Sequence, residues 1–279
     1  MIDIAHLLYK NKIKNVCISP GLRNTAISLT FIKHGKFNCH SIIDERSAGY
    51  FALGMALKTN TASALICTSG TATANYLPAI IEASQSKVPL IIITADRPAN
   101  LFNTGENQTI NQNNIYGDFV RVNLDLNEND NIINDINDSL KFVNGKYDNV
   151  ITGPIHFNIH LDDFKNFNNK IKPNKIQKKI FNQSSGGEID FNWNNLSFED
   201  VFNIHNYQKP LIIIGRLNYK LDMNLIIKLS KHLKAPILTD SLSQIRFNSN
   251  ENITLYDHYI DHDKINPDLI IRFGQKPVS

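Results

Sequence analysis

Short apolar runs alternate with helical segments in the amino-terminal part of the chain, and this alternation constrains the fold most strongly. Runs typical of buried strands span residues 15–19, 37–43, 62–68 and 90–95. Helices are expected between them, from about residue 24, over residues 48–58 and over residues 72–84. Strands and helices that alternate in this way form a parallel sheet with helices on both faces. The sequence therefore predicts an α/β fold.

The length of 279 residues suggests two domains, since roughly 150 residues per domain is typical. Strand-like residues 121–124 and 154–159, with a helix-like segment between them, complete a first domain over residues 1–165. The composition then shifts to Lys, Asn, Gln and Ser with little periodicity, which predicts a linker over residues 166–195.

A second α/β unit is expected over residues 196–279. Its strand-like segments are residues 211–215, 236–239 and 268–273, and its helix covers residues 222–233. The sequence stops directly after the last strand, without a helix to cover that strand. We therefore expect a Rossmann-like central domain that is incomplete.

Charge and hydropathy favour no macromolecular partner. Lys and Arg total 29 against 26 Asp and Glu, and the charges are scattered, so neither nucleic acid nor a membrane is expected as a partner. The first residues read as an amphipathic helix and lack the apolar block of a signal peptide, which predicts a cytoplasmic protein. Cys17, Cys39 and Cys67 show no metal-ligand spacing and are expected to be reduced core thiols.

Glu45 lies where the predicted strand 37–43 gives way to a helix. Further polar turns follow the other strands, at residues 19–23, 68–75 and 94–98. The carboxyl ends of parallel strands meet at one edge of a sheet, where such folds bind ligands. Glu45 is therefore a candidate acid or base. Alternatively, it belongs to a solvated charge cluster at a helix start, where acidic side chains favour the helix dipole.

The turn at residues 68–75 could hold an anion through free backbone amides, although it lacks the Lys of a phosphate loop. Alternatively, Gly70 only permits a tight turn while Thr71 or Thr73 caps the helix. No Gly-x-Ser-x-Gly motif supports a hydrolase. His258 and His262 could share a helix face, but a catalytic zinc ion usually needs three protein ligands, so no metal site is expected.

Arg23 and Arg97 could each present a planar fork to a carboxylate, or could simply pack their stems on the sheet. Asn107 and Gln108 lie in an amide-rich segment, residues 103–114, that reads as a functional loop. Their side chains offer donors and acceptors to an oxygenated ligand, and turn chemistry is the alternative.

Taken together, these motifs resemble the 2-succinyl-5-enolpyruvyl-6-hydroxy-3-cyclohexene-1-carboxylate synthases, which are thiamine-diphosphate enzymes of menaquinone biosynthesis. The resemblance runs in register from residue 16 to about residue 118, and more loosely over residues 209–279. The motifs that carry it are Ser19-Pro20-Gly21-x-Arg23, Asp44-Glu45-Arg46, Thr68-Ser69-Gly70-Thr71-Ala72-Thr73-Ala74-Asn75, Thr94-Ala95-Asp96-Arg97-Pro98 and Asn107-Gln108.

The resemblance implies a pyrimidine-binding domain, a central domain, and a third domain that holds the cofactor diphosphate through Mg²⁺ or Mn²⁺. That third domain should carry Gly-Asp followed by Asn. Gly117-Asp118 is the only Gly-Asp pair, and it lies in the wrong domain. The diphosphate-binding domain is therefore expected to be absent, with no metal ligand in this chain, so the fragment alone should be inactive.

By position, Glu45 matches the family's cofactor-activating glutamate, with Pro20 and Thr71 also in the cofactor site. Residues that match the substrate site are Arg23, Arg97, Asn107 and Gln108. The implied enzyme is a carbon–carbon bond-forming transferase. It decarboxylates 2-oxoglutarate and adds the succinyl carbanion to isochorismate, as a homodimer or homotetramer.

Leu22 departs from the pattern, because the family usually has Ser there. A hydroxyl near the reacting centre is thus missing. Two alternatives follow: another thiamine-diphosphate 2-oxoacid decarboxylase or synthase, of the acetolactate-synthase type, or a noncatalytic binding module that kept the shape of a pyrimidine domain.

Overall fold

The computed structural model divides into two compact units, residues 1–184 and 185–279, and each is described by itself. The described residues are 2–102, 104–127, 132–144, 151–161, 172–177, 207–217, 221–243, 245–246, 252–253 and 266–277.

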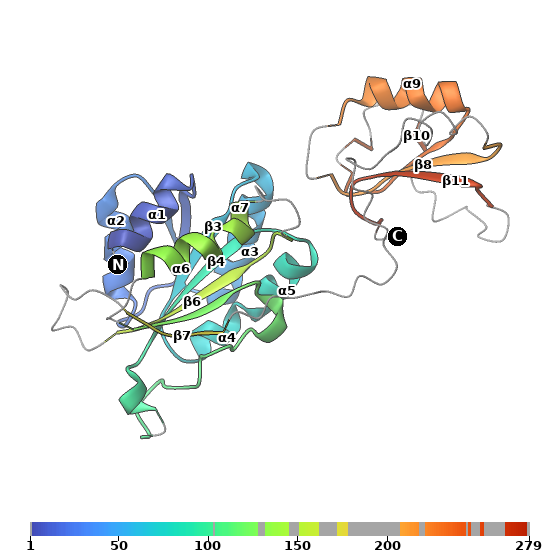
Figure 1. Ribbon diagram of the computed structural model, residues 1–279. Coiled ribbons are helices and arrows are strands. Elements are labelled where there is room, and N and C mark those ends of the chain that lie inside the picture. The colour runs from blue at the N-terminus through green and yellow to red at the C-terminus, as the bar shows by residue number, and fades with distance from the viewer. Residues whose placement is uncertain are drawn as a thin grey trace. The chain divides into compact units, whose positions relative to one another are not determined.

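The first unit is built on a seven-stranded sheet with the order β2-β1-β3-β4-β6-β5-β7 (Figure 1). Every neighbouring pair is parallel except β5 with β7, which is antiparallel. The predicted parallel α/β fold is therefore confirmed. The strands are β1 (Asn15–Ile18), β2 (Asn38–Ser41), β3 (Ser63–Cys67), β4 (Leu90–Asp96), β5 (Asn123–Asn127), β6 (Ile155–His160) and β7 (Lys172–Gln177).

Helices cover both faces of this sheet because successive strand residues point to opposite sides. In β1, Val16 and Ile18 belong to one buried cluster and Cys17 to the other. The first cluster packs under α1 (Ile2–Lys10), α2 (Thr25–His34), α6 (Ile132–Ser139) and α7 (Lys141–Asn144). The second packs under α3 (Glu45–Thr59), α4 (Thr71–Asn75) and α5 (Leu77–Gln85).

Two predicted helices have different limits in the structure. Helix α3 begins at Glu45 rather than at residue 48, because the Asp44 carboxylate accepts a 2.7 Å hydrogen bond from Ser47 N and caps the helix there. The single helix predicted over residues 72–84 divides at Tyr76 into α4 and α5. Pro78 lies in the first turn of α5, where a residue without an N–H is tolerated.

Strand β7 lies within the segment that the sequence assigned to the linker. It pairs with β5, and the boundary between the two units falls after Ser184. The rest of the linker segment, residues 166–171 and 178–195, lies outside the described residues.

The second unit contains a four-stranded parallel sheet with the order β10-β9-β8-β11. Its core joins strand residues such as Ile212 and Ile237 to Ile226 of the helix. Three of the strands were expected from the sequence, whereas β10 was not. The elements are β8 (Pro210–Ile214), α9 (Met223–Leu233), β9 (Ile237–Thr239), β10 (Asn252–Ile253) and β11 (Leu269–Phe273).

All three cysteines are free thiols, as expected. Cys17 and Cys67 are buried and Cys39 is half-buried. Burial raises the pKa of the Cys17 thiol to about 12, so this thiol stays protonated at neutral pH.

Candidate active site

The turns that follow β1 and β3 lie against each other at the carboxyl edge of the first sheet. Ser19 N donates to Ile66 O at 2.8 Å, which continues the parallel ladder to the end of β1. A Cβ atom added to Gly21 would lie 2.4 Å from Cβ of Thr68, so only glycine permits this approach. The structure thus brings together two of the polar turns that the sequence placed at one edge.

Glu45 is the first residue of α3 and its side chain is half-buried. Its Oε2 accepts a 3.3 Å hydrogen bond from Nδ2 of Asn75, the last residue of α4. The carboxylate therefore lies beside the helix that follows β3. This contact joins two of the motifs that were identified in the sequence.

Pro20 and Thr71 are exposed at the same edge. Thr71 begins α4, and Gly70 before it has a φ of +83°, a conformation that favours glycine. The backbone thus uses Gly70 for a tight turn, as the alternative explanation of this motif expected, but the expected cap is wrong: Gly70 itself is the N-cap of α4, and no side chain caps the helix. A conformational role does not prevent the turn from lining a ligand site.

The two arginines are anchored by backbone carbonyls. Arg23 Nη1 donates to Leu161 O, just after β6, at 2.8 Å. Arg97 donates to Asn107 O from Nε at 3.0 Å and from Nη2 at 2.7 Å, and its Nη1 lies 3.8 Å from Glu106 Oε2. Both guanidinium groups are thereby held at the carboxyl edge.

Gln108 docks the amide-rich loop on the turn after β3. Its Nε2 donates to Ser69 O at 2.9 Å, and its own carbonyl accepts from Ser69 Oγ at 3.0 Å. The side-chain amide of Gln108 therefore forms hydrogen bonds within the protein, whereas the sequence analysis predicted that it would contact a ligand. The side chain of Asn107 is exposed, and its backbone carbonyl receives Arg97.

Gln112 is fully buried and connects three parts of the edge, a role that sequence reasoning missed. Its Oε1 accepts from Gly70 N at 2.7 Å. Its Nε2 donates to Ala95 O at 3.1 Å and to Asn158 Oδ1 at 2.9 Å. One side chain thus ties the turn after β3 to the ends of β4 and β6.

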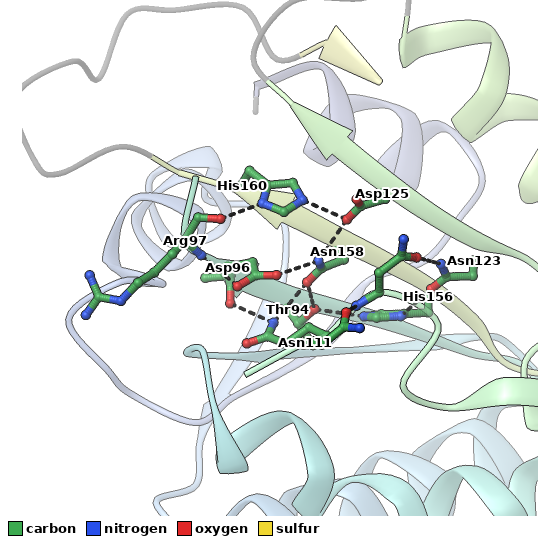
Figure 2. A network of polar contacts seen from close by, with 12 residues as sticks. Thr94, Asp96, Arg97, Asn111, Asn123, Asp125, His156, Asn158 and His160 are labelled. Atoms are coloured by element: carbon green, nitrogen blue, oxygen red, sulfur yellow. Dashed lines mark hydrogen bonds and ion pairs between the residues drawn. The ribbon is translucent and has the colours of Figure 1, made fainter. Parts of the chain in front are cut away.

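A network of polar side chains lies on one face of β4, β5 and β6 (Figure 2). Asn158 is its hub: Nδ2 donates to Asp96 Oδ2 and to Asp125 Oδ1, both at 2.8 Å, and Oδ1 accepts from Thr94 Oγ1. We name this set the strand network; its members are Thr94, Asp96, Asn123, Asp125, His156, Asn158 and His160.

The sequence does carry a signal for this network, in the alternation along β6. Ile155, Phe157 and Ile159 belong to the apolar cluster under α1 and α2. The residues between them are polar and therefore lie on the opposite face. A search for metal-ligand spacing among the histidines could not find this pattern.

His160 and Asp125 form a buried ion pair, with Nε2 2.8 Å from Oδ1. Burial alone would lower the pKa of His160, but the hydrogen bond and charge of Asp125 outweigh it and raise that pKa. Burial alone would raise the pKa of Asp125, but His160 lowers it. Both groups therefore favour their charged forms.

Asp96 and His156 have different environments from this ion pair. Burial raises the pKa of Asp96, despite the hydrogen bond from Asn158 that opposes the shift. Burial lowers the pKa of His156 to about 3. His156 is thus neutral at pH 7, and its single N–H can serve only one of its two neighbours, Asn123 Oδ1 at 2.6 Å or the rotatable hydroxyl of Thr94 at 2.8 Å.

Within the described ranges, no group of three or more His, Cys, Asp or Glu side chains could hold a metal ion. His258 and His262 lie outside those ranges. None of the helices that the structure describes is long and apolar enough to cross a membrane.

Residues 3–115 match the family model described as "Thiamine pyrophosphate enzyme, N-terminal TPP binding domain". The chain is also similar to 2-succinyl-5-enolpyruvyl-6-hydroxy-3-cyclohexene-1-carboxylate synthases. That of Bacillus pumilus is 35% identical over 96% of this chain and 48% of its own length. That of Chlorobium phaeobacteroides is 34% identical over 98% of this chain and 49% of its own length.

A third relative, the synthase of Staphylococcus haemolyticus, is 33% identical over 98% of this chain and 48% of its own length. The chain therefore spans about half the length of the curated relatives it matches. These similarities confirm the resemblance that the sequence motifs indicated. The chain is related to the thiamine pyrophosphate enzymes and, among them, to the 2-succinyl-5-enolpyruvyl-6-hydroxy-3-cyclohexene-1-carboxylate synthases.

Proposed function

We propose that this chain forms part of a thiamine-diphosphate-dependent transferase of menaquinone biosynthesis. The enzyme decarboxylates 2-oxoglutarate and adds the succinyl unit to isochorismate, giving 2-succinyl-5-enolpyruvyl-6-hydroxy-3-cyclohexene-1-carboxylate. The observation that carries the proposal is the position of Glu45, at the same sheet edge as the two anchored arginines. The names of the relatives support this choice of reaction.

The residues at this edge fit the pyrimidine end of the cofactor. Glycine at positions 21 and 70 lets the turns after β1 and β3 pack closely against Thr68 and Gln108, which fixes the backbone beside Pro20 and Thr71. Glu45, Pro20 and Thr71 would hold that ring. When bound, thiamine diphosphate supplies the electron sink for decarboxylation.

The role of Glu45 is to share a proton with a ring nitrogen through its carboxyl group. A carboxyl group can perform this role because it both accepts and donates a hydrogen bond, depending on its protonation. Asn75 Nδ2 donates to the same carboxylate and so helps to orient it.

Arg23 and Arg97 would bind the carboxylates of isochorismate. An arginine has five N–H donors, so a guanidinium that donates to a backbone carbonyl, as Arg97 does to Asn107 O, can bind a carboxylate as well. A charged hydrogen bond of this kind contributes about 1.5 to 3 kcal/mol. Asn107 would meet the hydroxyl groups, while Gln108 acts mainly by docking the loop on Ser69.

The proposal places Mg²⁺ or Mn²⁺, with the cofactor diphosphate, on a further domain of the enzyme, since the relatives are about twice as long as this chain. It also makes the enzyme a cytoplasmic homodimer or homotetramer. Helix α3 supports an oligomer because it leaves Tyr50, Phe51 and Leu57 more than a third exposed.

To test the proposal, the chain is combined with the remaining half of the Bacillus pumilus synthase, thiamine diphosphate and Mg²⁺. Release of carbon dioxide from 2-oxoglutarate is followed in the presence of isochorismate. We expect turnover by the mixture and none by the chain alone. Glu45→Gln should reduce the rate at least about 100-fold, as is typical for the loss of an acid–base group.

The matched control is Glu82→Gln, which changes an exposed glutamate of α5 and should leave the rate unchanged. An undiminished rate with Glu45→Gln would contradict the proposal. Preference for pyruvate over 2-oxoglutarate would instead favour an enzyme of the acetolactate-synthase type.

A noncatalytic binding module is the second candidate function, and Leu22 favours it. This leucine is 78% exposed at the candidate site, where the synthases usually have a serine. Binding of thiamine diphosphate by the combined halves without any turnover would support this alternative.

A further inference from the structure

His160 lies between two oxygen atoms that accept hydrogen bonds, a backbone carbonyl and the carboxylate of Asp125, whose lowered pKa keeps it ionised. Its Nε2 is 2.8 Å from Asp125 Oδ1, and its Nδ1 is 2.5 Å from the carbonyl oxygen of Arg97. A neutral imidazole has one N–H, whereas the imidazolium has an N–H on each nitrogen. The geometry therefore requires the protonated form, and the side chain is only 5% exposed.

The backbone of Arg97 is held on both sides by the strand network. Its N–H donates to Asp96 Oδ1 at 2.7 Å, and its carbonyl accepts from His160. Figure 2 shows the carbonyl of Arg97 directed at the imidazole while the guanidinium extends away from the network. The backbone from which the side chain starts is thus fixed at two points, and Asn107 O holds the guanidinium at the other end.

The groups around His160 come from several elements. Asp125 faces it from β5 and Asp96 from β4, and Asn158 bridges these two carboxylates. The ring of Phe102 lies 5.6 Å away, centroid to centroid. His156, on the same strand, is neutral at pH 7, and the guanidinium of Arg97 is turned toward Asn107 and Glu106.

We propose that His160, as an imidazolium, is a positioning residue for Arg97. It holds the Arg97 carbonyl and so fixes the direction of the guanidinium that binds a substrate carboxylate. The identity of that ligand rests on the proposed function above, whereas the coupling of His160 to Arg97 does not.

Deprotonation removes one of the two N–H donors, and either Asp125 or the Arg97 carbonyl then loses its partner. The raised pKa of His160 extends the pH range in which both donors are present, since its folded value lies above its unfolded value. The contact is therefore complete at low pH and is lost as pH rises through the folded pKa.

The first experiment follows nitrogen and proton resonances of the 279-residue chain from about pH 5.5 to 9, the range in which histidines titrate. We expect both ring nitrogens of His160 to carry protons at pH 7. The Arg97 Nε–H resonance should shift at the pH at which His160 loses its proton. The resonances of Arg121, a buried residue just before β5 that donates to Ser84, serve as an internal control and should not shift at that pH.

Two variants are used, so that the test does not depend on one substitution that could prevent folding. His160→Gln should abolish the pH-dependent shift at Arg97, and Asp125→Asn should move it to lower pH by lowering the pKa of His160. His6→Gln removes an exposed histidine of α1 and should change neither the size of the Arg97 shift nor the pH at which it occurs. An Arg97 resonance that is the same in wild type and His160→Gln at every pH would overturn the inference, as would a neutral His160 at pH 7.

The second experiment measures KM for isochorismate with the combined halves. His160→Gln should raise KM about tenfold with a smaller change in kcat, and Arg97→Lys should raise it further. The effects of the two changes should not add, because both act through one guanidinium. If the Arg97 resonance depends on His160 but KM does not change, the positioning role of His160 is supported and the proposed substrate site is contradicted.

Discussion

Gln112 Oε1 accepts a 2.7 Å hydrogen bond from the backbone N–H of Gly70 and so fixes the turn that opens α4. The same amide group donates to Ala95 O and Asn158 Oδ1. All of these contacts are buried, so water cannot replace them without a rearrangement. The candidate active site therefore depends on a residue that contacts no predicted ligand group.

Replacing Gln112 with Ala should lower the free energy of unfolding by about 2 to 4 kcal/mol, because the buried N–H of Gly70 and the buried oxygens of Ala95 and Asn158 each lose a hydrogen bond. Denaturant titration measures this loss. Gln85→Ala is the matched control, since this glutamine is exposed at the end of α5 and should cost less than about 0.5 kcal/mol. Equal losses for the two variants would show that the Gln112 contacts contribute little.

Gly70→Ala should be more destabilising than Gly105→Ala. Both glycines have positive φ, at +83° and +82°, so both substitutions strain the backbone, and the ψ of −144° at Gly70 lies close to a region that only glycine populates. A Cβ at Gly70 would also lie 2.8 Å from Cγ and 3.1 Å from the carbonyl oxygen of Gln108, whereas nothing lies within 4 Å at Gly105. We expect an extra loss of about 1 to 3 kcal/mol at Gly70, as for other overpacked sites.

The midpoints of urea unfolding would measure this difference. Hydrogen exchange of the backbone amides around Ser69 should be measured as well, because the hydroxyl and carbonyl of Ser69 hold Gln108. Similar midpoints for the two alanine variants would mean that the loop moves aside at little cost.

Burial of His156 should make the protein less stable in acid. Its folded pKa is about 3 and its unfolded value is 6.5, so the folded state binds fewer protons between these values. Above pH 6.5 this histidine does not reduce the free energy of unfolding. As pH falls from 6.5 toward 3, it lowers the free energy of unfolding by up to about 1.4 kcal/mol per pH unit. Unfolding free energies measured over this range should fall by that slope.

The variant His156→Gln should flatten this part of the pH profile, although it lowers stability at pH 7. His6→Gln should leave the slope unchanged because its side chain is exposed. Asp125 also loses its contribution in acid, since its folded pKa is lowered, so the relevant quantity is the difference between wild type and variant. A slope that survives in His156→Gln would assign the acid effect to other groups.

Leu22→Ser should restore a hydroxyl at the candidate site without a cost in stability. Leu22 is 78% exposed, so its replacement should change the free energy of unfolding by less than about 0.5 kcal/mol. With the combined halves, a neutral hydrogen bond to the substrate should raise kcat/KM about two- to tenfold. Leu225→Ser changes another exposed leucine, on α9, and should leave kcat/KM unaltered.

The alternation of apolar runs and helices was sufficient to predict the parallel sheet of the first unit. Strand β4, for example, is a continuous buried run, which is typical of a strand covered on both faces. Helix limits were less accurate. The cap at Asp44 and the break at Tyr76 depend on single residues that an apolar pattern does not detect.

The edge that gathers Glu45, Arg23 and Arg97 also followed from the sequence, because parallel strands must end on the same side. The contacts of these residues did not follow. Arg97 is held by the carbonyl of Asn107 and Arg23 by that of Leu161, and backbone carbonyls have no sequence signature.

Hydrophobic periodicity is a local property of a chain, and by itself it determined the α/β fold of this protein and the edge at which its polar turns meet. Hydrogen-bond partners on different strands are far apart in sequence, so only the tertiary structure decided the role of Gln112 and the charge of His160. The physical reason is burial: a polar group removed from water must find its partner nearby in space, wherever that partner lies along the chain.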